Sequence, residues 1–142
     1  MSNPLLDTSS LPRFDEIRPE HVLPAVRQVI AAQRDELDRL LHNGAAPDIA
    51  SLVAPVEHMG QELGRIWSPV SHLQSVLGSG DWREAYNEAL PLLTEFGTEL
   101  AQNAELQRAY AEVERNLPDD ASAESRRAIE NALRDFHLAG VD

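Results

Sequence analysis

The stretch LGRIWSPVSHLQSV, residues 63–76, decides the predicted fold. Trp67 closes an apolar stripe, Ser68 offers a side-chain oxygen as a helix N-cap, and Pro69 falls on the first helical position, where a missing N–H costs nothing. These residues therefore predict the end of one helix, a corner at Ser68-Pro69 and the start of another helix.

Apolar residues recur every three or four positions along most of the chain, which is the period of an amphipathic helix. Helices are predicted from about Leu23 to Asn43-Gly44, from an N-cap at Ser51 to Trp67, over residues 69–77 and 81–100, around Leu106–Leu117, and from Ser122 to about Gly140. A helix that started at Pro19 would contain Pro24, so a separate turn is expected there. Residues 1–18 lack this period and predict an extended N-terminal arm. No stretch alternates with a period of two, so we expect an all-α, irregular bundle of about five to six helices.

Length and charge narrow the possible functions. With 142 residues, 42% of them apolar, the chain is predicted to form a single helical domain over residues 1–142. Its formal charge of -12 argues against nucleic acid or an anionic membrane as a partner. It has no cysteine, and we see neither a leader peptide nor a membrane span, so we expect a soluble cytoplasmic protein. Val141-Asp142 follow an apolar helix so closely that the end resembles a cut.

Two groups of side chains were candidates for chemistry. His58 and Glu62 lie one helical turn apart and make half a metal site, but no His-Glu-x-x-His motif accompanies them. His72 has three serine neighbours, Ser68, Ser71 and Ser75, yet the sequence shows no nucleophile elbow and no orienting acid. A surface pair and a structural histidine are the simpler explanations. The sequence therefore assigns no catalytic, cofactor-binding or metal residue.

Several stretches in a fixed order resemble the N-terminal segment of the thimet oligopeptidase family of zinc peptidases. They are Asn3–Leu6, Pro19–Val22 with Pro24–Val26, Leu63–Leu73, Arg83–Tyr86 with Leu90–Leu93, and Asn131–Phe136 with Gly140. The resemblance implies a longer, two-lobed helical enzyme that hydrolyses short peptides in a deep channel, with zinc bound by residues that this chain lacks. It also implies that this part is non-catalytic alone, forms channel wall and packs against the remainder of the enzyme.

Two further hypotheses stay open at this point. A free-standing helical interaction module would use an exposed apolar face to bind a partner or to self-associate. An independent hydrolase centred on His72 would need activity that is lost in His72→Ala. Arg65, His72 and Arg134 are candidates for lining a cleft, because polar groups at a corner or on a late helix can face one. The peptide specificity of a parent enzyme cannot be read from these residues.

Overall fold

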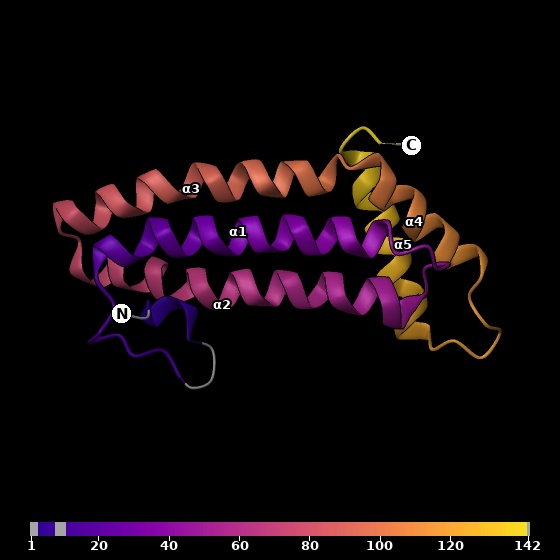
Figure 1. Ribbon diagram of the computed structural model, residues 1–142, viewed down its shortest axis with the longest axis horizontal. Coiled ribbons are helices and arrows are strands. Elements are labelled where there is room, and N and C mark those ends of the chain that lie inside the picture. The colour runs from indigo at the N-terminus through magenta and orange to yellow at the C-terminus, as the bar shows by residue number, and fades with distance from the viewer. Residues whose placement is uncertain (1–2, 8–10, 142) are drawn as a thin grey trace. The chain divides into compact units, whose positions relative to one another are not determined.

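The computed structural model describes residues 3–7 and 11–141. This part of the chain contains no strand and folds into five α-helices: α1 (Pro19–Leu41), α2 (Ala54–Leu77), α3 (Gly80–Ala101), α4 (Ala104–Arg115) and α5 (Ala123–Leu138). Two short turns, the 3₁₀ turn η1 (Pro4–Leu6) and the π turn η2 (Ile49–Val53), complete it. Figure 1 shows the course of the chain. The predicted fold class, an all-α irregular helical bundle, is confirmed.

The chain divides into two compact units, and long helices contribute to both of them. The first unit consists of Met1–Arg34 and Met59–Phe96, and the second of Asp35–His58 and Gly97–Asp142. The prediction of one domain over residues 1–142 stays a prediction.

The first unit packs parts of α1, α2 and α3 around a shared apolar core. Its fully buried side chains include Val22, Val26, Val70 and Phe96, and Ala25 and Ala89 are buried as well. Polar and aromatic contacts join each pair of helices: the Gln33 side-chain amide donates to the Met59 carbonyl at 2.8 Å, the Trp67 and Tyr86 rings lie 5.0 Å apart, and the Arg34 guanidinium lies 5.6 Å from the Phe96 ring centre.

The second unit packs α4 and α5 against each other and brings α4 onto η2. Leu52, Leu106, Val113 and Ile129 are buried there, and the Tyr110 and Phe136 rings lie 5.8 Å apart. α5 begins where the sequence predicted, next to Ser122, which caps it because its hydroxyl oxygen accepts from the Ser125 N–H at 3.0 Å.

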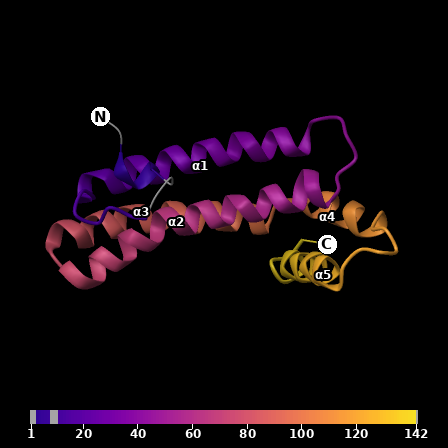
Figure 2. The ribbon, with the colours of Figure 1, turned by 90° about the horizontal axis from the view of Figure 1, so that it is seen from below.

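The predicted corner at Ser68-Pro69 is wrong. α2 continues through both residues to Leu77, and Figure 2 shows one uninterrupted helix. Ile66, Val70 and Leu73 keep the helical spacing across the proline, and all three are buried. Burying this continuous stripe outweighs the local stop signal and the roughly 3 kcal/mol that an interior proline costs.

Three helix starts also differ from the prediction. α1 begins at Pro19 and contains Pro24. In its first turn, His21 Nδ1 accepts a hydrogen bond from the Arg18 N–H at 2.9 Å. The cap before η2 is Asp48, which accepts from the Ser51 N–H while the Ser51 hydroxyl accepts from the Asp48 N–H. Ser79 precedes α3 and accepts from the Trp82 N–H at 3.4 Å, so α3 begins at Gly80, one residue before the predicted start at Asp81. In each case the element begins earlier in the sequence than predicted.

Part of the predicted N-terminal arm forms the 3₁₀ turn η1. Asn3 caps η1 by accepting from the Leu5 N–H, and Leu5 and Ile17 are buried. Leu11, in the same arm, is 87% exposed. Residues 1–2 and 8–10 of the predicted arm lie outside the described residues.

Candidate functional site

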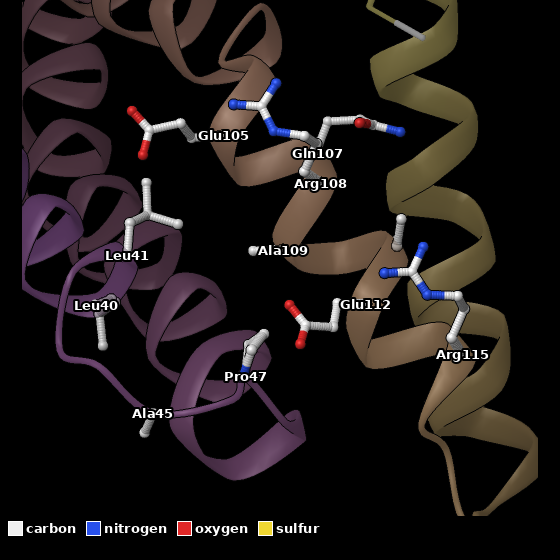
Figure 3. A pocket seen from close by; sticks show the side chains of 11 residues that line it. Leu40, Leu41, Ala45, Pro47, Glu105, Gln107, Arg108, Ala109, Glu112 and Arg115 are labelled. Carbon is white, nitrogen blue, oxygen red and sulfur yellow. The ribbon is translucent and has the colours of Figure 1, made fainter.

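An open groove runs along α4 in the second unit. One side consists of the end of α1 and the segment after it, with Leu40, Leu41, Ala45 and Pro47, and the other consists of α4 residues from Glu105 to Arg115. Its volume is about 650 Å³. In Figure 3 the Glu105 and Glu112 side chains extend from α4 toward Leu41 and Pro47. The groove therefore combines an apolar side with a charged one.

His42 connects the two sides of the groove, because it follows Leu41 at the end of α1 and contacts Glu105 on α4. Its Nε2 lies 2.7 Å from Glu105 Oε2, and its Nδ1 lies 3.0 Å from both the carboxylate and the main-chain carbonyl oxygen of Asp38. The hydrogen bond and negative charge of Glu105 raise the His42 pKa, and Asp38 adds to this effect. The sequence placed His42 beside a helix C-terminus, but nothing in it indicated that Glu105, 63 positions away, is its partner.

Tyr110 lies on α4 among the groove residues but belongs to the core. Only 5% of its surface is exposed. Burial, with a smaller contribution from the negative charge of Glu57, raises the pKa of Tyr110 to about 12. It is therefore a neutral packing residue near pH 7.

The structure gives His72 a packing contact. Its ring meets the Phe14 ring edge to face, with centroids 5.3 Å apart, so it holds the arm on α2. Within the described part of the chain, no hydrogen bond joins His72 to Ser68, Ser71 or Ser75. In the described residues, these serines therefore give no nucleophile that is hydrogen-bonded to a histidine base.

The other candidate residues do not converge. His58 and Glu62 lie on α2, and among residues 3–7 and 11–141 no three His, Asp or Glu side chains gather as metal ligands. Arg65 is exposed on α2. Arg134 is exposed on α5 and donates to the Asn131 side-chain oxygen at 3.0 Å. None of these side chains lines the α4 groove.

Comparison with known proteins gives the chain its family. Residues 26–142 match the model of the neurolysin/thimet oligopeptidase N-terminal domain. The chain belongs to this family. The resemblance that the sequence stretches indicated is thereby confirmed.

Matches to individual proteins point the same way. The chain is 42% identical to oligopeptidase A of Escherichia coli over 146 residues, 99% of this chain and 21% of that protein. It is 41% identical to oligopeptidase A of Haemophilus influenzae over 144 residues, with 99% and 21% covered. It is 30% identical to the "Probable cytosolic oligopeptidase A" of Arabidopsis thaliana over 142 residues, with 99% and 20% covered. The chain thus corresponds to an N-terminal segment of oligopeptidase A and spans about a fifth of the length of these relatives.

An open groove with an apolar side and spaced carboxylates can hold a polypeptide segment, whereas hydrolysis needs an activated nucleophile in contact with a base. Across residues 3–7 and 11–141, no helix combines the length and apolar character required to cross a membrane.

Proposed function

We propose that this chain is the N-terminal helical part of an oligopeptidase A-like zinc metallopeptidase that hydrolyses short peptides. In this proposal it forms part of the substrate-channel wall, packs against the rest of the enzyme, and is not catalytic alone. Zinc is held by residues of the remaining enzyme, short peptides are the substrates, and the enzyme works in the cytoplasm.

One observation carries the proposal. Nearly the whole chain, 99%, aligns with oligopeptidase A at 42% identity, and the aligned part is only 21% of that protein. A segment of this size matching from end to end favours the same structural role in a protein of the same kind. The location is supported by the match to the Arabidopsis protein whose name includes the word cytosolic.

Exposed apolar residues support the packing role. In the first unit, Val76 and Leu77 at the end of α2 are 65% and 56% exposed, and in the second unit Leu138 at the end of α5 is 76% exposed. Such residues, each at a helix end, are suited to contact a further part of a larger protein. The groove along α4 is a candidate piece of channel wall because it is concave and open.

The test compares this 142-residue chain with the product of its complete gene. Peptidase activity on a short quenched-fluorescence peptide and bound zinc are measured for both proteins. We expect hydrolysis and one equivalent of zinc in the longer product only. Zinc-dependent hydrolysis by the short chain would refute the non-catalytic role, and a gene that encodes no zinc-binding motif after residue 142 would refute the parent enzyme.

A free-standing interaction module is the alternative that this comparison separates. It predicts a gene product without peptidase activity that binds a partner through the same exposed apolar residues. Self-association of the short chain does not distinguish the two hypotheses, because under both of them the isolated chain exposes Val76, Leu77 and Leu138.

A further inference from the structure

His42 lies between the ends of two helices in the second unit. It directly follows the last residue of α1, and its main-chain N–H donates to the Asp38 carbonyl at 3.1 Å. Glu105 lies in the first turn of α4. The His42 ring therefore joins the C-terminal end of α1 to the N-terminal end of α4 across 63 positions of sequence.

The partners of this ring determine its protonation state. Its Nε2 faces a carboxylate oxygen of Glu105, and its Nδ1 faces two oxygens of Asp38. All of these oxygens accept hydrogen bonds and donate none. A neutral imidazole carries only one N–H, so one of its nitrogens would present a lone pair to an acceptor. Only the imidazolium form can donate on both sides at once, so this arrangement of acceptors favours it.

Helix electrostatics favour the same assignment of charge. A cation is stabilised at the C-terminal end of α1, where main-chain carbonyls lack partners, and an anion is stabilised in the first turn of α4. The nearby cation on α1, Arg39, pairs with Glu36, so it does not compete for Asp38. Asp38 from α1 and Glu105 from α4 are the charged groups that face the ring, and both favour its protonated form.

We propose that His42 is a protonation-dependent latch between α1 and α4. As an imidazolium it ties the end of α1 to the start of α4, and loss of its proton breaks one of the two contacts. The segment between His42 and Asp48 forms part of the groove wall, through Ala45 and Pro47. Release of the latch therefore loosens one side of the groove as the pH rises.

The sign of the pH effect follows from the raised pKa of His42. Stabilisation by the latch is complete below the ordinary histidine pKa, about 6.5, because the ring is then charged in both the folded and the unfolded chain. It decreases as the pH rises through the higher pKa of the folded state. The latch is thus closed in mildly acidic solution and opens as the pH rises through the raised pKa of His42.

The test is a histidine-ring NMR titration of the full chain, with Glu105→Gln, Asp38→Asn and His42→Gln variants and His58→Gln as a matched surface control. The His42 signals are those that disappear in His42→Gln. We expect both His42 ring nitrogens to carry protons at pH 6. We also expect its pKa to fall in Glu105→Gln and to fall less in Asp38→Asn, because Glu105 is the stronger cause of the shift.

Amide hydrogen exchange tests the conformational part of the proposal. After correction for intrinsic exchange rates, protection of the segment 43–48 should decrease above the His42 pKa in the parent chain and in His58→Gln. It should be lower and independent of this titration in His42→Gln. A neutral His42 at pH 6, an unchanged pKa in Glu105→Gln, or protection that ignores the His42 titration would each overturn the latch. Amide spectra of the variants establish that they remain folded.

Discussion

Replacing Tyr110 by phenylalanine should remove a specific loss of stability in alkaline solution. The folded chain holds the Tyr110 pKa at about 12, against an ordinary value of 10.0, mainly because the ring is buried. Between these values the unfolded chain has released the phenolic proton and the folded chain has not. The Tyr110 titration therefore does not lower the unfolding free energy below about pH 10, and it lowers it increasingly as the pH rises toward 12. Two pKa units correspond to about 3 kcal/mol of unfolding free energy.

The composition makes this effect measurable. The chain has no lysine and no cysteine, and only two tyrosines, so few other side chains titrate in this range. Urea unfolding at about pH 9 and about pH 12 gives the change in stability, and ultraviolet absorbance of tyrosinate gives the titration. Tyr110→Phe keeps the ring packed on Phe136, and Tyr86→Phe is the matched control.

Two results would refute this reasoning. One is an absorbance wave near pH 10 that disappears in Tyr110→Phe, which would show that the phenol is accessible to solvent in the folded chain. The other is an equal alkaline loss of stability in Tyr110→Phe and in the parent chain. The expected result is a loss that Tyr86→Phe retains and Tyr110→Phe largely lacks.

Further predictions concern the core and the helix ends. Phe96→Ala should lower the unfolding free energy by about 3–5 kcal/mol, because the ring is 1% exposed and a cavity would remain; Phe96→Leu, measured in the same urea titration, should cost less. Ser122→Ala should cost about 1 kcal/mol through loss of the α5 cap, and Ser122→Asp should restore most of it. Gly140 has φ +95°, so Gly140→Ala should cost about 1–2 kcal/mol, whereas Gly97→Ala inside α3 should not destabilise the chain. Equal effects within any of these three pairs of variants would contradict the corresponding assignment.

The all-α fold class and many of the helix ends were predictable from the sequence because they depend on local chemistry. Gly44, Gly78 and Gly140, which were expected to mark helix ends, all have positive φ. The α5 end also has the hydrogen bonds of a Schellman motif, from the Gly140 N–H to the His137 carbonyl and from the Val141 N–H to the Phe136 carbonyl. These signals act within a few residues and need no partner from elsewhere in the chain.

The Ser68-Pro69 corner was wrong because its local signals competed with a tertiary effect. Ser-Pro is a common helix start, but the same residues also occupy positions on a continuous apolar stripe. Which effect prevails depends on whether another helix covers the stripe, and in the structure Pro69 and Val70 are both buried. The sequence contains both signals but does not show which of them determines the structure.

The candidate site was beyond prediction for a related reason. Leu40–Pro47 and the α4 residues from Glu105 onward form one groove although about sixty positions separate them. The sequence instead drew attention to His72, whose serine neighbours are adjacent in the chain but make no hydrogen bond with it in the described part of the structure. Long-range contacts such as His42 with Glu105 become visible only once the helices are packed.

The most direct test of the central claim is a chimera with oligopeptidase A of Escherichia coli. In it, the segment of that enzyme matched by this chain is replaced by residues 1–142, and hydrolysis of a short peptide is measured beside the parent enzyme and a deletion of the same segment. We predict an active chimera and an inactive deletion, because the chain supplies channel wall and packing surface. A chimera that is folded and monodisperse but inactive, or a deletion as active as the parent enzyme, would contradict the proposed role.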